Sequence, residues 1–280
     1  MDLSFIIVNY NVTELLRNCL LSIQKFAGEI SHEVIVIDNN STDQSWRRLI
    51  NEFQEVQFIA SEHNDGFAKA NNRAVAAANG EWVYILNPDT ELEGFYLAEL
   101  LNFAQNASRF GSLGLRMHDA DGNFLPESKR SVPNVFNSFS KLFIGGRKTS
   151  KKSYYRDDIG EQEVAEVEIL TGANLLMKKS VYLEAGGFDE SYFMYGEDID
   201  LCYTLLQHGY RNFYYGKYAL LHHKGESTVK DEKYLQNFYG AMDIFIAKYY
   251  RNKPFQKIIL RSGLWLKHRL EKRKLQHTET

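Results

Sequence analysis

Short apolar runs alternate with amphipathic stretches through the first ninety residues of the chain. The apolar runs predict strands at residues 3–9, 32–37, 56–60 and 81–86. The stretches between them have helical spacing and predict helices at residues 13–27, 45–53 and 66–78. Connections this short favour parallel crossovers. The pattern therefore predicts an α/β fold whose central sheet is mostly parallel and is flanked by helices.

A polar cluster follows each of these predicted strands at its C-terminal end. The clusters are Asn9-Tyr10-Asn11, residues 38–43, residues 61–66 and Asn87-Pro88-Asp89. Because parallel strands point the same way, we expect the clusters to meet along one edge of the sheet. Ligands of open α/β sheets bind at that edge. The pattern thus predicts one polar crevice built from segments that are distant in sequence.

Asn87-Pro88-Asp89 ends the apolar run from Trp82 to Leu86 abruptly. Pro88 cannot continue a hydrogen-bonded ladder, so Asp89 is placed at the C-terminal end of the strand. One interpretation is a functional carboxylate at the ligand-binding edge. The other is turn chemistry, because Asn-Pro-Asp-Thr favours a turn and Asp89 could cap a following helix.

The pattern changes after a predicted helix at residues 94–106. The further elements predicted are strands at 112–117, 123–126, 164–177, 212–215 and 220–223, a helix at 197–208, and two helices that finish the chain. Gly172 and Ala173 interrupt the strand at 164–177 and would permit close approach of a ligand to the backbone. The polar run 145–153 is interpreted either as a mobile loop or as a simple connector.

Composition excludes several classes of protein. At 280 residues, the chain is long enough for one large domain or two small ones, and its net charge of -3 gives no overall attraction to nucleic acid. Cys19 and Cys202 show no metal-ligand spacing, so we expect a reducing, cytoplasmic compartment. We find neither a signal-peptide pattern nor 18 consecutive apolar residues, and therefore expect no secretion by that route and no membrane-spanning helix.

Charge is concentrated in the tail, where residues 248–274 carry ten basic side chains and the single acid Glu271. Ile258, Trp265 and pairs of leucines recur there at roughly helical spacing. Such a helix suits an anionic membrane surface, with apolar residues entering the interface and basic residues meeting headgroups. It also suits a helix that packs its apolar stripe on the domain and solvates its charges. Residues 229–280 are thus predicted to be a basic helical extension, with peripheral contact to the cytoplasmic face of a membrane as one interpretation.

Gly196-Glu197-Asp198-Ile199-Asp200 places three carboxylates in five residues at the start of a predicted helix. Acids in a first helical turn are commonly structural, because they complement the helix dipole. The largely aromatic group Tyr192-Phe193-Met194-Tyr195 stands directly before them and indicates a role beyond structure. Such a wall would raise the pKa of a carboxyl group by desolvation and would stack against a sugar ring.

Further acids and imidazoles indicate a nucleotide and a metal. Asp38 ends the second predicted strand, where an acid can accept hydrogen bonds from ribose or a base edge, although no Gly-x-Gly-x-x-Gly precedes it. The segment that begins at Asp65 is not a phosphate-binding loop, so a bound diphosphate would need a metal. Asp89 with His222 or His223 offers oxygen and nitrogen ligands that suit Mn²⁺ or Mg²⁺ better than Zn²⁺.

Eight motifs stand in order along residues 3–228. They are Ile6-Ile7-Val8-Asn9-Tyr10-Asn11, Val36-Ile37-Asp38-Asn39-Asn40-Ser41-Thr42-Asp43, Asn64-Asp65-Gly66-Phe67-Ala68-Lys69-Ala70-Asn71-Asn72, Leu86-Asn87-Pro88-Asp89, Gly172-Ala173, Gly187-Phe188-Asp189-Glu190, Gly196-Glu197-Asp198-Ile199-Asp200-Leu201-Cys202 and His222-His223-Lys224-Gly225-Glu226-Ser227. This ordered set resembles the family 2 glycosyltransferases and, within them, the rhamnosyltransferase-like branch.

The resemblance implies a GT-A fold over residues 1–228, with a nucleotide-binding half at 1–90 and an acceptor-binding half at 91–228. It implies an inverting transfer of a sugar from a dTDP- or UDP-sugar to an acceptor hydroxyl in cell-surface polysaccharide assembly. The acceptor would be a saccharide or a lipid-linked saccharide, and a divalent metal, Mn²⁺ or Mg²⁺, would assist.

Residue roles follow from the matching motifs. The resemblance implies that Asp198 is the general base, that Glu197 lies beside it, and that Asp89 and His222 hold the metal. The residues implied for nucleotide binding are Val8, Asn9, Tyr10, Asp38, Asn40, Asp65, Gly66, Asn71 and Asn87. The residues implied for acceptor binding are Gly172, Ala173 and Tyr195.

This chain departs from the family pattern in two places. Asn87 stands where Asp-x-Asp would supply a second carboxylate to the metal, and Thr204 stands where many relatives have a cation. Cationic help to the diphosphate is therefore expected from Arg211 or Lys224.

Three other classes of function compete with this prediction. A glycoside hydrolase could also use two carboxylates, but it would need neither the nucleotide cluster at Asp38 nor a metal. A sugar nucleotidyltransferase would share the nucleotide half but would need a phosphate loop rich in glycine and lysine, where this chain has Asn9-Tyr10-Asn11-Val12. A nucleotide-sugar-binding module would require Asp198 to be only a helix-capping residue.

Overall fold

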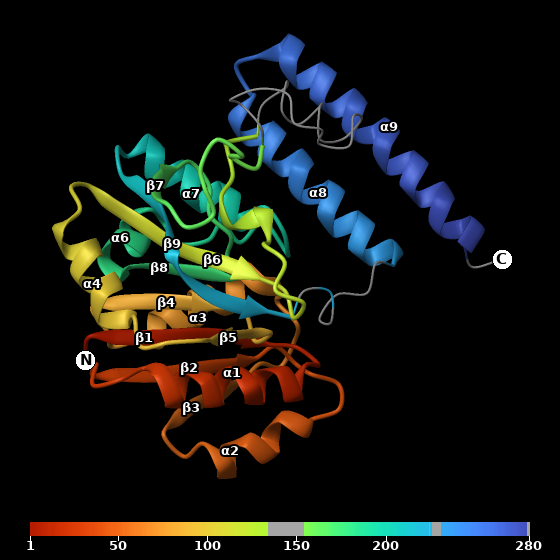
Figure 1. The fold of residues 1–280 in the computed structure, drawn as a ribbon. Coiled ribbons are helices and arrows are strands. Elements are labelled where there is room, and N and C mark those ends of the chain that lie inside the picture. The colour runs from red at the N-terminus through yellow and green to blue at the C-terminus, as the bar shows by residue number, and fades with distance from the viewer. Residues whose placement is uncertain (134–153, 224, 226–230, 279–280) are drawn as a thin grey trace.

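The computed structural model describes residues 1–133, 154–223, 225 and 231–278, and within them nine strands form one sheet (Figure 1). The strands are β1 Leu3–Asn9, β2 His32–Asp38, β3 Val56–Ala60, β4 Trp82–Leu86, β5 Thr90–Leu92, β6 Phe110–His118, β7 Val164–Val167, β8 Asn174–Lys178 and β9 Arg211–His222. The helices are α1 Thr13–Phe26, η1 Ser45–Arg48, α2 Leu49–Glu52, α3 Gly66–Ala77, α4 Leu97–Asn106, η2 Pro126–Ser128, α6 Lys179–Glu184, α7 Glu197–Gln207, α8 Glu232–Tyr249 and α9 Pro254–Thr278, where η marks a 3-10 helix.

The strands lie in the order β3-β2-β1-β4-β8-β6-β9-β5, and β7 pairs with β9. Strands β3, β2, β1 and β4 are parallel, as the short crossovers predict. Beyond β4 the sheet is mixed, because β8 runs antiparallel to both β4 and β6 while β6 and β9 are parallel. The α/β class is confirmed, and the expectation of a mostly parallel sheet holds for its N-terminal half alone.

Helices cover both faces of the sheet and bury two apolar cores. Helices α1, α2 and α4 pack on one face with side chains such as Leu16 and Leu100. Helices α3, α6 and α7 pack on the other with side chains such as Ala74, Tyr182 and Leu205. Because apolar residues recur at helical spacing in the sequence, each helix has one apolar face, and that face packs against the sheet.

Several predicted elements differ from those observed. Residues after Asp89 form β5 rather than a helix, so the helix-capping interpretation of Asp89 is wrong. The turn interpretation is confirmed, because the backbone N–H and side-chain hydroxyl of Thr90 both donate to the Asn87 carbonyl at 3.2 and 2.7 Å. The predicted hairpin strand at 123–126 is reduced to one bridge between His118 and Phe124, and η2 follows it.

The two short strands predicted at 212–215 and 220–223 form the single strand β9. Its partner β6 carries the pairing through with a shift of register, which places Tyr215 opposite Leu115 and Ala219 opposite Arg116. A bulge of this kind keeps a strand in the sheet where the local sequence suggests a break. The run predicted as one interrupted strand instead forms β7 and β8, which occupy separate positions in the sheet. The run 145–153, interpreted as a mobile loop or a connector, lies outside the described residues.

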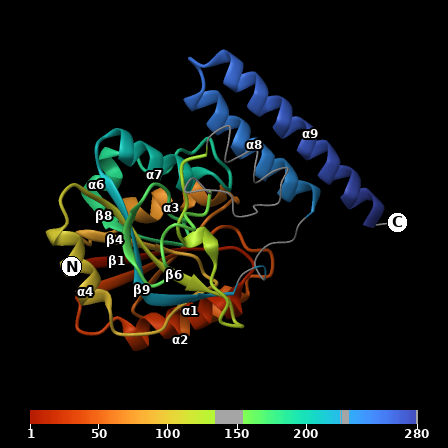
Figure 2. The same cartoon turned by 45° about the horizontal axis from the view of Figure 1, so that its top comes forward.

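Helices α8 and α9 form an antiparallel hairpin beside the sheet (Figures 1 and 2). Leu260 and Leu264 of α9 turn toward α8 and join a third apolar cluster with Leu235, Tyr239 and Phe245. In the part of the chain that the structure describes, no helix has the length and apolar character needed to cross a bilayer.

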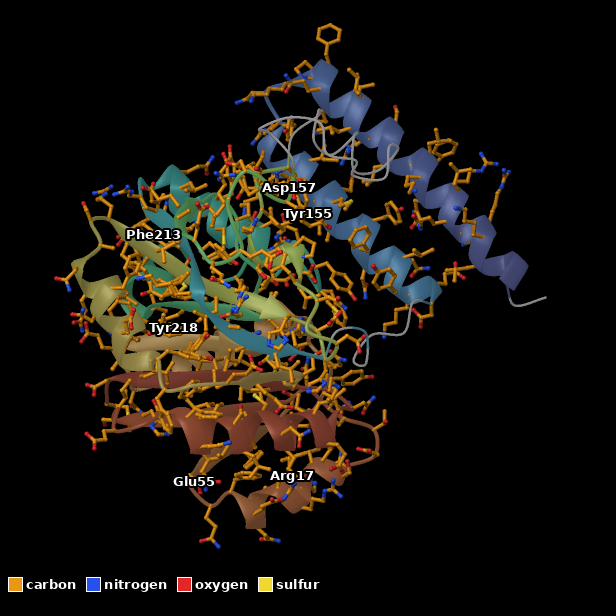
Figure 3. The ribbon with its side chains drawn as sticks, viewed as in Figure 1. Arg17, Glu55, Tyr155, Asp157, Phe213 and Tyr218 are labelled. Carbon is orange, nitrogen blue, oxygen red and sulfur yellow. The ribbon has the colours of Figure 1, made fainter. Side chains whose placement is uncertain are left out.

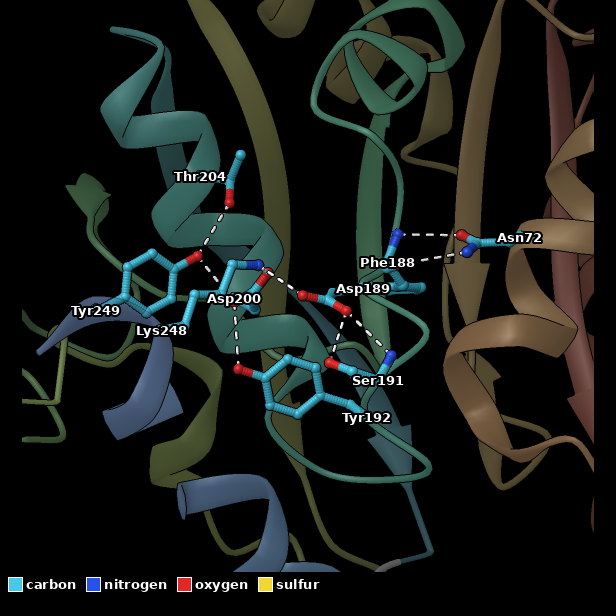
Figure 4. A network of polar contacts seen from close by, with 9 residues as sticks. All are labelled: Asn72, Phe188, Asp189, Ser191, Tyr192, Asp200, Thr204, Lys248 and Tyr249. Atoms are coloured by element: carbon cyan, nitrogen blue, oxygen red, sulfur yellow. Dashed lines mark hydrogen bonds and ion pairs between the residues drawn. The ribbon is translucent and has the colours of Figure 1, made fainter. Parts of the chain in front are cut away.

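A polar network fastens the C-terminal end of α8 to α7 (Figure 4). The Lys248 ammonium donates to Asp189 at 2.7 Å and to Asp200 at 2.8 Å, and the Tyr249 hydroxyl donates to Asp200 at 2.8 Å. The Tyr192 hydroxyl adds a bond to Asp200 at 3.2 Å. Because Asp200 is buried, this network lets α7 accommodate a carboxylate in its first turn and fixes the hairpin to it.

Candidate active site

The ends of β1 and β2 coincide, because the parallel register places Asn9 opposite Asp38. The Asn9 side-chain amide donates to the Asp38 carboxylate at 2.8 Å, and Ser41 donates to it from its backbone N–H at 3.0 Å and its hydroxyl at 2.5 Å. Asp38 is buried. Its carboxylate therefore links the end of β1 to the loop after β2, at the point where the sequence predicts the nucleotide pocket.

The third strand tip joins the same edge through Asn39. Its side-chain amide donates to Asn64 at 2.9 Å and to the Gly66 carbonyl at 3.1 Å. Gly66 has a φ of 83°, and a Cβ there would lie 2.2 Å from the carbonyl oxygen of Phe193. Only glycine fits such a position, so the start of α3 can lie directly against the segment that leads into α7.

Asp89 and His222 meet at the other side of this edge, because β5 pairs with β9 and places Thr90 opposite His222. His222 Nε2 lies 3.3 Å from Asp89 Oδ1, and both side chains are largely buried. His223 points instead to Glu91, at 2.7 Å. Of the two histidines considered from the sequence, His222 is the one beside Asp89.

An oxygen and a nitrogen donor side by side fit a divalent cation that takes its other ligands from phosphate and water. The buried Nδ1 of His222 has no hydrogen-bond partner among the described residues, so the imidazole is not committed to another contact. The described residues contain no group of three or more His, Cys, Asp or Glu side chains that could hold a metal. Among the described residues a metal here would have two ligands, Asp89 and His222, in keeping with Asn87 at the position of the missing carboxylate.

Asp198 is held by residues from two other segments. Arg130 Nη2 donates to Asp198 Oδ2 at 2.6 Å and to the Leu170 carbonyl at 2.5 Å. The Gly172 backbone N–H donates to the same Asp198 oxygen at 3.1 Å. Burial would lower the pKa of Arg130, but Asp198, Tyr154 and Cys202 together outweigh this effect and raise it, so the guanidinium stays charged.

Glu197 precedes Asp198 in the chain, and its carboxyl group has a raised pKa. Burial raises the pKa of Glu197 to about 8, and the neighbouring charge of Asp198 adds to the rise. The predicted desolvation of a carboxyl group in this cluster is therefore observed at Glu197. At neutral pH, Glu197 is mostly protonated and can donate a hydrogen bond.

One cavity of about 1000 Å³ is lined both by Asp89 and His222 and by Glu197 and Asp198. Of the residues predicted for donor, metal and acceptor, the cavity is lined by Val8, Tyr10, Gly66, Asn87, Asp89, His222, Gly172, Ala173, Tyr195, Glu197 and Asp198. Tyr155, labelled in Figure 3, lines it as well. Asp89 and Asp198, more than a hundred residues apart in sequence, thus face a common space.

Five residues predicted for nucleotide binding do not line this cavity: Asn9, Asp38, Asn40, Asp65 and Asn71. The Asn71 amide donates to the Phe67 carbonyl within α3 at 2.9 Å, and Asp65 pairs with Lys69 at 2.9 Å. Both contacts are local to one helix. Asn9 and Asp38 bond to each other at the ends of β1 and β2 and do not line the cavity, so their direct contact with a nucleotide stays a prediction.

Sequence reasoning missed several residues that line the cavity, and Arg130 and Asn39 are two of them. Arg130 lies in a polar, irregular stretch without a motif, and nothing local to it indicates its pairing with Asp198. Asn39 was noted only as part of a polar cluster. Arg211, expected to help with the diphosphate, begins β9 at the end opposite His222 and pairs with Glu166, so that expectation is wrong. Lys224 lies outside the described residues.

This mixed sheet, with its polar crevice at the carboxyl ends of the parallel strands, is that of a GT-A glycosyltransferase. The structure superposes on a crystal structure of GalNAc-T7 with UDP, GalNAc and Mn²⁺, with a TM-score of 0.65 and 16% identity over 91% of this chain and 50% of that one. It also superposes on a Pyrobaculum calidifontis mannosyltransferase described in complex with GDP-Man and Mn²⁺, with a TM-score of 0.61 and 18% identity over 94% and 69% of the chains.

The chain belongs to glycosyltransferase family 2: the sequence pattern described as "Glycosyl transferase family 2" matches residues 4–182. It is 30% identical to the N-acetylglucosaminyl-diphospho-decaprenol L-rhamnosyltransferase of Mycobacterium tuberculosis, over 88% of this chain and 84% of that protein. It is 24% identical to rhamnosyltransferase WbbL of Escherichia coli, over 78% and 82%. The protein is therefore a glycosyltransferase with rhamnosyltransferase relatives, as the ordered motifs predict.

Proposed function

We propose that the protein is an inverting glycosyltransferase that moves a sugar from a dTDP- or UDP-sugar to an acceptor hydroxyl. The proposed sugar is a deoxyhexose such as rhamnose. The observation that carries the proposal is the shared cavity of Asp89 and Asp198. One acid lies where a diphosphate would be held, and the other lies where a hydroxyl would be activated. The rhamnosyltransferase relatives support the class of sugar.

Asp198 is the general base in this proposal. Glu197 is unsuited to that role near neutral pH, because its pKa of about 8 leaves it mostly protonated. The contacts from Arg130 and Gly172 to Asp198 Oδ2 orient the carboxylate. Glu197, as a hydrogen-bond donor in the same cavity, would bind an acceptor or sugar oxygen.

The reaction needs no covalent intermediate. Asp198 takes the proton of the acceptor hydroxyl as that oxygen forms a bond to the anomeric carbon. The bond from this carbon to the diphosphate oxygen breaks, and its electron pair leaves with the nucleoside diphosphate. Attack from the face opposite the leaving group inverts the anomeric configuration.

Asp89 and His222 would hold Mn²⁺ or Mg²⁺ in this proposal. The metal, when bound, stabilises the negative charge of the diphosphate. The remaining acceptor residues, Gly172, Ala173 and Tyr195, line the cavity next to Asp198 and would position the hydroxyl. Tyr10, which is 40% exposed, offers an aromatic face on the nucleotide side.

The acceptor is proposed to be a lipid-linked saccharide at a membrane, in cell-surface polysaccharide assembly. The name of the Mycobacterium tuberculosis relative includes such a lipid. A second support is the outward face of α9, where Phe255 is 82% exposed and Trp265 is 61% exposed. Four further apolar side chains are exposed on this helix: Ile258, Ile259, Leu266 and Leu270.

This outward face, defined by those six apolar residues, is flanked by Arg261, Arg269, Lys272 and Arg273. Apolar side chains beside basic ones match an anionic lipid surface. A second copy of the chain would instead bring like charges together on the same face. We therefore assign the face to peripheral membrane contact at residues 248–274.

Sedimentation with vesicles tests the membrane contact. The protein is expected to bind vesicles that contain an anionic phospholipid, and binding should weaken in high salt. The double variant Phe255→Ser, Trp265→Ser should lose binding, whereas Leu21→Ser, an equally apolar change on the exposed side of α1, should keep it. Equal binding by all three proteins would contradict the assignment.

A thermal-shift and hydrolysis screen of nucleotide sugars, with and without Mn²⁺, tests the reaction. We expect stabilisation by UDP or dTDP that increases with Mn²⁺, and slow hydrolysis of one matching sugar donor. Binding without any turnover, unchanged in Asp198→Asn, would favour a nucleotide-sugar-binding module. Formation of a nucleotide sugar from a sugar phosphate and a nucleoside triphosphate would favour the nucleotidyltransferase.

A further inference from the structure

The cavity that contains Asp89 and Asp198 does not end at the edge of the sheet but continues along the α8–α9 hairpin. The side chains that the hairpin contributes to it are largely apolar. They include Leu235, Phe238, Met242, Ile246, Leu260 and Leu264. We call this apolar end of the cavity the hairpin groove. One continuous space thus joins a polar end, where the reaction is proposed, to an apolar end.

The hairpin groove begins next to the proposed acceptor position. The ring of Tyr195 lies edge-on to Tyr234 and Phe238, with centroids 5.4 and 6.0 Å apart. From there α8 extends for about 27 Å at 1.5 Å per residue. Lys267 and Lys274 line the cavity from α9, as does Glu271, which pairs with Lys267 at 3.4 Å.

The chemistry of the groove favours a hydrocarbon over a peptide. A peptide backbone buried there would need hydrogen-bond partners for its amide groups, and leucine, phenylalanine and methionine side chains offer none. Two tyrosine hydroxyls of α8 and the turn after it have partners inside the protein. The Tyr250 hydroxyl donates to the Pro133 carbonyl at 3.2 Å, and the Tyr249 hydroxyl donates to Asp200 at 2.8 Å.

We propose that the hairpin groove holds the polyprenyl chain of the acceptor, so that the C-terminal helices form the lipid subsite of the enzyme. The outward face of α9 would contact the membrane. Its inward face would bind the polyprenyl chain between the bilayer and Asp198. The inference rests on the lipid-linked acceptor proposed above. The protein would then bind the lipid chain of the acceptor as well as its saccharide.

Two acceptors with the same diphosphate-linked saccharide test the proposal, one with about ten isoprene units and one with two. Rates are measured at a fixed detergent concentration over a range of acceptor concentrations. For the unchanged protein, the KM of the long acceptor is expected to be at least tenfold lower than that of the short one. Met242→Glu and Leu260→Glu place a charge in the hairpin groove, and each should raise the KM of the long acceptor about tenfold.

Activity on the short acceptor serves as the folding control, because neither variant should change its KM or kcat. Gln236→Glu adds the same charge to an exposed position of α8 and should keep the preference for the long acceptor. The proposal is overturned if the groove variants retain the full chain-length preference, or if they weaken both acceptors equally. If the protein transfers sugar to neither lipid acceptor but does transfer it to a soluble saccharide, the lipid-linked acceptor itself is wrong.

Discussion

Arg130 Nη2 and Asp198 Oδ2 lie 2.6 Å apart and form an ion pair whose side chains are 10% and 12% exposed. The pair joins the polar stretch that follows β6 to the first turn of α7, across 68 residues of sequence. With so little water nearby, each charge depends on the other for its stabilisation. The proposed base is thus positioned by Arg130, a residue that lies outside all eight sequence motifs.

Removal of Arg130 should destabilise the fold as well as misplace the base. Arg130→Gln is expected to lower the free energy of unfolding by roughly 3–5 kcal/mol, since it leaves Asp198 as a buried, unpaired charge. Adding Asp198→Asn to this variant should restore part of the loss. Urea unfolding of the two single variants and the double variant measures the coupling.

The exposed pair of Arg17 and Glu52 supplies the control, with side chains 39% and 34% exposed. Arg17→Gln should cost about 1 kcal/mol or less. Equal costs for Arg17→Gln and Arg130→Gln would show that the buried pair has no special weight.

Asp198→Asn should reduce turnover strongly and leave donor binding intact. General base catalysis contributes about 10²–10⁴-fold, so kcat should fall by a factor in that range. The dissociation constant for UDP, measured by calorimetry, should change less than threefold. Asp121→Asn, at an exposed turn, is the matched control and should keep full activity. A large loss of UDP affinity in Asp198→Asn would argue against the assignment.

Glu197 should make the protein less stable as the pH rises. Its pKa is about 8 in the folded protein, where burial and Asp198 oppose ionisation despite attraction from Arg130, against an ordinary value of 4.5. The folded state therefore holds the proton that the unfolded state has released. The stabilisation is complete below pH 4.5 and is lost as the pH rises toward 8.

Urea unfolding at pH 5.5 and pH 8 should show this loss in the unchanged protein. Glu197→Gln should reduce the difference, and Glu62→Gln, at an exposed loop position, should leave it unchanged. If Glu197→Gln keeps the full difference, another group is responsible.

Binding of Mn²⁺ can be followed without any turnover. The change in Tm on adding Mn²⁺ in the presence of UDP should shrink markedly in His222→Gln, because one of two proposed protein ligands is lost. Asp89→Asn should behave similarly. His223→Gln should match the unchanged protein, since His223 pairs with Glu91. Identical shifts in the two histidine variants would reject His222 as a ligand.

Lys248 should control how firmly the hairpin is attached. Lys248→Met removes the contacts to Asp189 and Asp200 and leaves the buried Asp200 with tyrosine hydroxyls alone. We expect faster proteolytic cleavage between α7 and α9 than in Lys253→Met, a change at an exposed position. Equal cleavage rates would mean that the apolar contacts of α8 hold the hairpin by themselves.

The sequence predicts the first ninety residues better than the rest of the chain. Residues from Leu3 to Leu86 form strands and helices from local patterns, and their parallel order follows from short crossovers. Tyr215 and Ala219 show the limit, because their strand continues only through pairing with β6. The adjacent positions of Asp89 and His222 likewise depend on the pairing of β5 with β9, and the local pattern at Asp89 favours a helix cap just as well.

By itself, the sequence determined the class of fold, the family and the acids at the strand tips, because periodicity and motif order are local and survive without contacts. Tertiary structure alone decided which histidine lies beside Asp89, which cation pairs with Asp198, and that burial raises the pKa of Glu197. It also decided that α9 packs one apolar side on α8 and exposes another. These outcomes depend on burial and on pairs of residues far apart in the chain, neither of which a local pattern contains.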